Sequence, residues 1–428
     1  MQANHFQPHS VSADQALTPV PVAPHCKTDE FGPFTSYGKD AHRVTFVGDT
    51  HPVFHGTVVK AVASGLRTYP QVMAALNLPA NSAGEAAEYA AFRARMTDVL
   101  QPRVESVQRH SPTVVEVRVR APLAAKNFRP GQFFRLQNFE RRAPLVEGTR
   151  LQTEALALTG AGVDKSTGCI SLMVLELGAS SRVCATLKPG DDIVLMGPTG
   201  VPSEIPQGQT VMIIGGRRGA AVIRTLGPAL RAANNRVLYM AGFQTADEVY
   251  CQADLEAGAD VIVWCTATGR AVTPRRPQDR AHTGDYMEIV RQYAAGELHA
   301  PQNAPIPLSD VDRIVIVGTN RLIRMVKDAR HGVLRDYLSK KSPLTVASVG
   351  SPMQCMLQGV CSQCLQWQID PQTGKRTRAV FSCAGQDQIL DAVDLDNLDA
   401  RLAQNRLQER LTNLWLDYLF AHNDIARV

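Results

Sequence analysis

Four cysteines in the C-terminal part of the chain are spaced like the ligands of one metal centre. Cys355, Cys361 and Cys364 fall within ten positions, and Cys383 follows them further along the chain. Thiolates are the ligands that iron–sulfur clusters and structural zinc share. The cysteine set therefore predicts a four-thiolate metal site.

The segment between the last two cysteines has the pattern of a β-hairpin. Apolar and polar residues alternate from 365 to 370, and Pro371 and Gly374 mark a turn before a second strand at 377–381. Folding the second strand back onto the first brings Cys383 beside Cys364.

Three occupants of the cysteine set are open: a 2Fe-2S cluster, a zinc ion, or none. A tight loop of thiolates with a last ligand from elsewhere is typical of two-iron clusters. Structural zinc usually has two C-x₂-C pairs, and here only Cys361 and Cys364 form one. The spacing favours the 2Fe-2S cluster. A disulfide framework is not expected, because the cysteines are nine in number and the first 24 residues have no apolar signal core.

A glycine-rich turn follows the apolar run TVMII and precedes a helical pattern. Its glycines, Gly215, Gly216 and Gly219, would let backbone amides and a helix N-terminus approach a pyrophosphate. Arg217 and Arg218 strengthen this interpretation, because cations at the positive end of a helix are unfavourable unless an anion lies between them. The alternative is a pair of solvated arginines.

A second strand–turn–helix pattern places Gly318 after VDRIVIV. In an open parallel sheet this turn would face the same crevice as the first one. The alternative is an ordinary loop.

A third turn contains Gly178, Ala179, Ser180 and Ser181 before a short helical stretch. Small residues and hydroxyls at a helix start suit a second diphosphate cradle. The alternative is a simple helix cap.

The elements that must position these residues fall into several parts, as expected for 428 residues of which 44% are hydrophobic. We predict an antiparallel β-barrel, an α/β open parallel sheet and a small iron–sulfur hairpin domain. The predicted boundaries are 102–206 for the barrel, 207–348 for the α/β domain, 349–393 for the cluster domain and 394–428 for a C-terminal helix.

The first part of the chain, residues 1–101, is less regular. We expect a flexible leader at 1–30 and a helical connector at 80–94.

Composition excludes several classes. The formal net charge is +5 with scattered basic residues, which argues against nucleic acid as the main partner. Because no apolar run approaches the roughly 18 residues of a membrane span, we expect no such span and a cytoplasmic location. No catalytic triad or paired-carboxylate pattern supports a hydrolase.

The order of these parts resembles the ferredoxin-NADP reductase superfamily. PGQFFRLQN, GASS, GPTG, IIGGRRG and the cysteine tail follow one another as in the branch of the dihydroorotate dehydrogenase electron-transfer subunit and the small subunit of sulfide dehydrogenase (NADH-dependent ferredoxin-NADP oxidoreductase). The resemblance implies FAD in the barrel near the GASS turn, NAD(P)H at the glycine-rich turns, and a 2Fe-2S cluster on the four cysteines.

The chain departs from that family at two motifs. The flavin-contacting strand of the family carries an arginine, and residues 154–159 contain none. The family's Cys-Gly-Pro loop is Val317, Gly318 and Thr319 here.

Residues 30–75 resemble the C-terminal FAD motif of pyridine nucleotide-disulfide oxidoreductases of the glutamate synthase small-subunit type. In that motif a strand ends in Gly-Asp and a helix follows, and Gly48 and Asp49 occupy these positions. The resemblance implies that Asp49 meets a flavin ribityl chain. The G-x-G-x-x-G domain that should precede the motif is missing from the sequence, so a partner or a fused segment would supply it.

Together these patterns predict a subunit that passes electrons between NAD(P)H, a flavin and a 2Fe-2S cluster. The expected partner is a flavoprotein subunit of the pyridine nucleotide-disulfide oxidoreductase type, with ferredoxin as a further candidate. The alternatives are a non-catalytic electron-wire scaffold that has lost its own flavin, and a zinc-stapled binding module.

Overall fold

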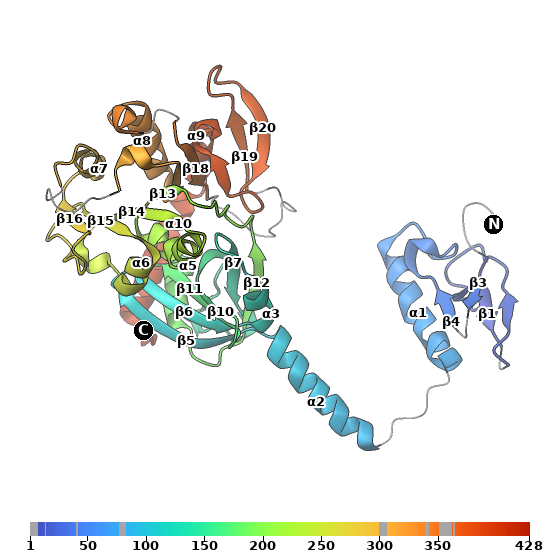
Figure 1. Ribbon diagram of the computed structural model, residues 1–428. Helices are drawn as coiled ribbons and strands as arrows, with labels where there is room; N and C mark the ends of the chain where they lie inside the picture. The colour runs from blue at the N-terminus through green and yellow to red at the C-terminus, as the bar shows by residue number, and fades with distance from the viewer. Residues whose placement is uncertain are drawn as a thin grey trace. The chain divides into compact units, whose positions relative to one another are not determined.

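The computed structural model describes residues 7–12, 14–39, 42–76, 83–298, 306–338, 342–350, 362 and 364–428. The chain divides into two compact units, Met1–Phe92 and Arg93–Val428 (Figure 1). Helix α2 (Ala83–Leu100) runs across this boundary, where we expected a helical connector. The two units are described separately below.

The first unit contains a four-stranded antiparallel sheet. Its order is β2-β1-β3-β4, formed by β1 (His9–Val11), β2 (Leu17–Pro19), β3 (Phe34–Lys39) and β4 (His42–Thr45). The expectation of a flexible leader at 1–30 is therefore wrong for β1 and β2. Their hairpin closes through a turn in which Gln15 takes a φ of +65° and its N–H donates to Ser12 O at 2.9 Å.

The second unit begins with a six-stranded antiparallel sheet in the order β12-β7-β10-β11-β6-β5. The strands are β5 (Arg103–Ser111), β6 (Val114–Arg120), β7 (Phe133–Asn138), β10 (Leu156–Asp164), β11 (Cys169–Leu175) and β12 (Ile193–Thr199). Short elements surround them: α3 (Pro122–Asn127), β8 (Leu145–Val146), β9 (Thr149–Arg150) and α4 (Ala179–Val183).

The two ends of this sheet meet, so the predicted antiparallel barrel is confirmed. The Val104 N–H donates to Asp191 O at 2.9 Å, and the Ile193 N–H donates to Pro102 O at 3.2 Å. Inside, the alternate valines of β6 pack with residues of the other strands. Period-two burial of this kind is what the sequence pattern predicted.

The α/β part has a seven-stranded sheet in the order β16-β15-β14-β13-β17-β18-β21. Six strands are parallel: β13 (Thr210–Gly215), β14 (Arg236–Phe243), β15 (Val261–Thr266), β16 (Arg280–Thr283), β17 (Arg313–Val317) and β18 (Leu344–Ser348). The edge strand β21 (Asp387–Ile389) is antiparallel and comes from beyond the cysteine segment. The predicted open parallel sheet is thus confirmed.

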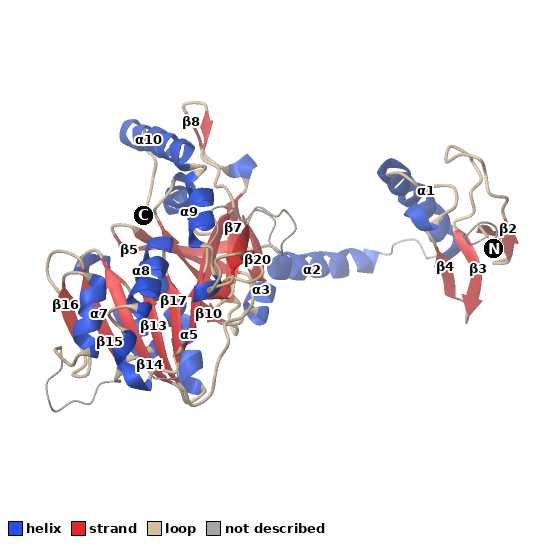
Figure 2. Cartoon of the chain, turned by 90° about the horizontal axis from the view of Figure 1, so that it is seen from above, coloured by secondary structure: helices blue, strands red, loops and turns tan. Residues whose placement is uncertain are grey.

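Helices cover both faces of this sheet (Figure 2). Helices α7 (Tyr286–Ala294) and α8 (Asn320–His331) pack on one face, and α5 (Arg217–Ala232) and α6 (Gln252–Gly258) on the other. The core on the α5 side also includes Val114, Ala161 and Met173 of the barrel, so the two parts share one apolar interface.

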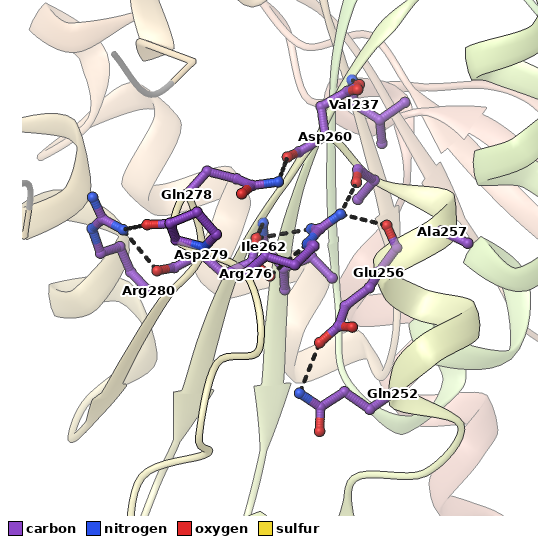
Figure 3. Close-up of polar contacts among 12 residues, drawn as sticks. Val237, Gln252, Glu256, Ala257, Asp260, Ile262, Arg276, Gln278, Asp279 and Arg280 are labelled. Atoms are coloured by element: carbon purple, nitrogen blue, oxygen red, sulfur yellow. Dashed lines mark hydrogen bonds and ion pairs between the residues drawn. The ribbon is translucent and has the colours of Figure 1, made fainter. Parts of the chain in front are cut away.

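A buried ion pair fixes the end of α6. Arg276 donates to both carboxylate oxygens of Asp279, at 2.9 and 2.8 Å, and to the carbonyl oxygens of Glu256 and Ala259 (Figure 3). Asp279 also accepts from the Ile262 N–H at 2.8 Å. A charge pair whose remaining lone pairs are satisfied in this way tolerates burial, and here it locks α6 against β15.

The C-terminal part contains the hairpin β19 (Leu365–Ile369) and β20 (Arg376–Phe381), then α9 (Leu395–Ala403) and α10 (Arg406–His422). We expected one amphipathic helix here, and the structure has two. The buried residues of α9 join the α/β core, whereas those of α10 pack on the barrel. A single straight helix cannot serve both surfaces, so the chain breaks between them.

Candidate functional site

The two described members of the cysteine set lie together. Cys364 and Cys383 are each 1% exposed and share one cluster with Phe133, next to Met196. The Ser382 N–H donates to Cys364 O at 3.2 Å, so the hairpin brings Cys383 beside Cys364 as the sequence predicted. Neither forms a disulfide with another described cysteine. Cys355 and Cys361 lie outside the described residues.

The described residues alone do not complete a metal site. Among them, no group of three or more His, Cys, Asp or Glu is placed to hold a metal ion. Two of the four predicted ligands are not part of that search, so the cluster stays a prediction.

The segment that follows the cysteine hairpin is bound to the barrel by hydrogen bonds. Gln386 Nε2 donates to the carbonyl oxygens of Gly131 and Val201, at 3.1 and 2.5 Å. Ser203 Oγ donates to Asp387 at 2.6 Å, and burial raises the pKa of that carboxyl group. The sequence reasoning missed Gln386 and Asp387, because their partners lie more than 180 residues away.

The hairpin buries its polar face. Gln366 and Gln368 are buried, whereas the apolar residues that alternate with them, Leu365, Trp367 and Ile369, are only half-buried. Both amide atoms of Gln366, and Ser382 Oγ, are buried without a hydrogen-bond partner among the residues that the structure describes. Buried polar atoms of this kind call for a partner, and cluster sulfurs can accept hydrogen bonds from the two donors among them, Gln366 Nε2 and Ser382 Oγ. The surroundings of Cys364 and Cys383 therefore fit a cluster.

The glycine-rich turn between β13 and α5 is tightly packed. A Cβ at Gly216 would lie 2.3 Å from Gly242 O, and one at Gly215 would lie 2.7 Å from Val317 O. Because Val317 ends β17, the first turn lies directly beside the turn that holds Gly318, as the sequence predicted. At Gly318 a Cβ would lie 2.5 Å from Leu322 Cδ2. Close packing is a sufficient reason for glycine at these positions, and no ligand is needed to explain them. The backbone of these turns lies at the carboxyl edge of the sheet.

The two arginines of this turn point to different neighbours. Arg217 donates to Thr113 Oγ1 at 3.0 Å and pairs with Glu248 at 3.4 Å, so it ties the barrel to the α/β part. Arg218 is exposed, and its Nη1 lies 3.6 Å from the position of a Cβ at Gly350. Gly350 leads into the cysteine segment. Of the two arginines, Arg218 is therefore the one that could contact an anionic cofactor. The sequence pattern alone did not distinguish Arg217 from Arg218.

The turn with Gly178, Ala179, Ser180 and Ser181 forms the start of α4, but its groups are engaged within the chain. Ser180 Oγ accepts from the Glu154 N–H at 3.0 Å, and Ser181 Oγ accepts from the Gly178 N–H at 3.0 Å. This is the capping arrangement that we named as the alternative.

Helix α10 covers the same turn. A Cβ at Gly178 would lie 3.0 Å from Glu409 Oε1, and Arg182 is bound to Asn413 and Asp417. A carboxylate next to this backbone would repel the negatively charged diphosphate that is expected there. A carboxylate and the polar contacts of Arg182 therefore lie where a flavin diphosphate is expected, and FAD in the barrel stays a prediction.

One cation lies beside the strand that lacks the family's arginine. Arg135 on β7 is the register partner of Ala157 on β10, and its side chain reaches Met196 Sδ at 3.3 Å. Its Nε is buried without a partner among the described residues. PGQFFRLQN contains this arginine, and the sequence reasoning missed it because cross-strand pairing is needed to place it.

In the first unit, Gly48 and Asp49 lie in a short turn between β4 and α1 (Val58–Leu76). Gly48 has a φ of +64°, which favours glycine. Asp49 is exposed and accepts from the Gly56 N–H at 2.8 Å. The strand, Gly-Asp turn and helix thus follow in the predicted order, and the flavin contact stays a prediction.

Helix α1 exposes its apolar side. Its buried residues are Ser64 and Thr68, whereas Val58 is 80% and Leu66 is 66% exposed. We call the exposed apolar residues the α1 stripe. It consists of Val58, Val59, Val62, Leu66, Tyr69, Met73 and Leu76.

No protein-family model matches the chain. An uncharacterised protein of Rickettsia prowazekii is 28% identical over 377 residues, which are 87% of this chain and 42% of that protein. A dihydroorotate dehydrogenase B electron transfer subunit homolog of Thermotoga maritima is 27% identical over 151 residues, 35% of this chain and 50% of that protein. The chain thus spans about half the length of the curated relatives that it matches.

Among solved structures, a chain of the NADH-dependent reduced ferredoxin-NADP oxidoreductase has a TM-score of 0.56 at 20% identity. The match covers 73% of this chain and 96% of that one, and it shows a common fold. No described helix is long and apolar enough to cross a membrane. The chain is therefore similar to dihydroorotate dehydrogenase B electron transfer subunits over about a third of its length, and it shares the fold of a ferredoxin-NADP oxidoreductase chain, the likeness that the motifs indicated.

Proposed function

We propose that this chain is an electron-transfer oxidoreductase subunit that passes electrons between NAD(P)H, a flavin and a 2Fe-2S cluster, to or from a partner flavoprotein. The observation that carries the proposal is the burial of Cys364 and Cys383 side by side against Phe133 of the barrel. Cys355 and Cys361 would complete the ligand set. When bound, such a cluster accepts and releases single electrons.

The protein's own residues would hold and tune the cluster. Gln386 and Asp387 fix the hairpin on the barrel, and Gln366 and Ser382, whose side chains have no hydrogen-bond partner among the described residues, offer donors to sulfur. Hydrogen bonds to the sulfurs and burial are two of the means by which proteins set cluster potentials.

The dinucleotide would lie along the carboxyl edge of the parallel sheet. Ligands in open α/β sheets bind there, and here the turns with Gly215 and Gly318 lie side by side. Arg218 supplies a cation at this edge, and its Nη1 lies 3.6 Å from the position of a Cβ at Gly350, which leads into the cysteine segment. This proximity supports NAD(P)H as the electron donor or acceptor on this side.

A partner protein is supported by the α1 stripe. A helix normally buries its apolar side, and large exposed apolar surfaces mark interaction sites. Asp49 lies in the turn that precedes this helix. We infer that a flavoprotein of the pyridine nucleotide-disulfide oxidoreductase type covers the α1 stripe and that Asp49 meets its flavin. Ferredoxin is a second candidate partner for the cluster.

A second candidate function is an electron-wire scaffold that has no flavin of its own. The position of Glu409 beside Gly178 favours it, because α10 takes the place of the expected FAD diphosphate. The cysteine site is the same in the two candidates, and they differ only in the barrel.

Cofactor analysis of the full chain, purified without oxygen, tests these proposals. Iron and sulfide in equal amounts with flavin support the first, iron and sulfide without flavin support the scaffold, and zinc without sulfide supports a stapled binding module. Substoichiometric iron that does not increase after reconstitution with iron and sulfide would contradict both cluster proposals.

A further inference from the structure

A cysteine, a histidine and a glutamate from three different elements meet at the junction of the barrel and the α/β part. Cys251 immediately precedes α6, His110 lies near the end of β5, and Glu116 lies on β6. His110 Nδ1 lies 3.8 Å from Cys251 Sγ, and His110 Nε2 lies 2.7 Å from Glu116 Oε2. The histidine thus contacts a thiol with one ring nitrogen and a carboxylate with the other.

The two polar partners hold His110 in its charged form. The hydrogen bonds to Cys251 and Glu116 raise the pKa of His110 to about 9, while the bond from His110 lowers that of Glu116 to about 2. Of the other charged groups, Arg224 lies 3.8 Å from Glu116 and pairs with Asp254 at 2.9 Å. The contacts with Glu116 and Cys251 therefore favour the imidazolium form of His110, in which each ring nitrogen carries a hydrogen.

The surroundings fix the position of the cysteine. Cys251 has a φ of +49° and a ψ of +42°, a left-handed conformation that is uncommon outside glycine. The preceding Tyr250 donates from its hydroxyl to Arg217 O at 2.6 Å, and burial raises the pKa of this phenol, so it stays neutral. Arg276 holds the far end of α6 (Figure 3).

An imidazolium beside a sulfur favours the thiolate, which is the reactive form of cysteine. A histidine oriented by a carboxylate is the usual arrangement for activating a nucleophile. Cys251 is half-buried, so part of the residue is exposed to solvent.

We propose that Cys251 is a reactive thiol, activated by His110 and oriented through Glu116, that exchanges with small disulfides. Its thiolate attacks one sulfur of the disulfide, and a new bond forms between Cys251 Sγ and that sulfur. The old sulfur–sulfur bond breaks, its electron pair leaves with the second sulfur, and the proton from His110 Nδ1 completes the released thiol. Cys251 is oxidised to a mixed disulfide, and the small disulfide is the oxidant.

The other interpretation is structural: Cys251 packs as a small apolar residue, and His110 and Glu116 only join two parts of the fold. Cys26 provides an internal control, because it is also half-buried and packs against apolar residues of the first unit's core, although Arg67 donates to its carbonyl oxygen at 2.7 Å. Each cysteine is read separately by peptide mass spectrometry after timed reaction of the full chain with oxidised glutathione.

At about pH 6.5 we expect Cys251 to react several-fold faster than Cys26, because an imidazolium beside the sulfur favours the thiolate. His110→Gln and Glu116→Gln should bring the rate at Cys251 toward that of Cys26 and leave Cys26 unchanged. Equal rates at the two cysteines of the wild-type chain would overturn the proposal, and this comparison needs no variant to fold. An unchanged rate at Cys251 in a folded His110→Gln chain would overturn it as well.

Discussion

Glu409 Oε1 lies 3.0 Å from the point that a Cβ of Gly178 would occupy. One carboxylate of the C-terminal helix therefore covers the backbone where a flavin diphosphate was expected. Arg182, which could otherwise meet a phosphate, is held by Asn413 and Asp417 of the same helix. The chain thus supplies its own anionic partner to this turn.

Removing that carboxylate should favour FAD. We expect Glu409→Gln to strengthen FAD binding by about 1 kcal/mol, because a like charge near the diphosphate is lost. Fluorescence titration with FAD measures the effect. Asp424→Asn, which removes the same charge from an exposed position, is the control. The same affinity in both variants would show that Glu409 does not exclude the cofactor.

The cysteine set should be required for iron and not for the fold. We expect Cys361→Ser or Cys364→Ser to abolish cluster assembly, because serine is a poor substitute for a thiolate ligand. The α/β part should keep its structure, since its cores lie elsewhere. Iron and sulfide analysis together with circular dichroism checks both statements. Cys169→Ser, on the barrel, is the control and should retain iron.

The two arginines of the glycine-rich turn should separate in function. Arg218→Ala should weaken NAD(P)H binding by about 1–3 kcal/mol, the usual range for a lost charge-assisted hydrogen bond. Arg217→Ala should instead lower thermal stability, because Arg217 joins Thr113 and Glu248. Calorimetric titration and thermal unfolding of both variants distinguish the two roles. Reversed effects would mean that Arg217 turns toward the cofactor.

Asp49 should matter only in an assembly. In the isolated chain, Asp49→Ala loses the hydrogen bond from the Gly56 N–H, so stability should fall by no more than about 1.5 kcal/mol. In a complex with the flavoprotein partner, the same variant should retain less flavin. Flavin content of the purified complex is the measurement. Equal flavin retention would leave the first unit as a self-contained structural element.

The pair of His110 and Glu116 should stabilise the fold only within a limited pH range, with losses at high and at low pH. The pKa of His110 is raised from 6.5 to about 9, so its contribution is complete below about 6.5 and is lost as the pH rises through 9. The pKa of Glu116 is lowered from 4.5 to about 2, so its contribution is complete above about 4.5 and is lost as the pH falls through 2. Melting temperatures of wild type and His110→Gln should therefore differ more at pH 6 than at pH 9.5.

Local patterns of the sequence predicted the local structures. The alternate valines of β6 predicted a strand with one buried face, and the hairpin pattern placed Cys383 beside Cys364. The glycine turns after β13 and β17 were located correctly because strand, turn and helix follow each other directly in the chain.

Contacts between distant segments could not be predicted in this way. Nothing near Gly178 in the sequence indicates that Glu409 will lie on it, and Gln366 has the polarity of a surface residue although it is buried. The different contacts of Arg217 and Arg218 likewise depend on Glu248, which pairs with Arg217 and belongs to the next βα unit. These features follow from packing, and a single sequence carries no pairwise signal for them.

The first and last strands of the barrel are far apart in the chain, so the barrel closes at a defined stage of protein synthesis. The hydrogen bond from Val104 to Asp191 cannot form until both edges of the sheet have left the ribosome. The α4 turn is complete at that stage, whereas α10 is still to be made. During translation the turn is therefore open for the time needed to produce more than 200 further residues, roughly 10–40 s at typical elongation rates. The proposed loading of this barrel with FAD would therefore compete in time with the synthesis and docking of α10.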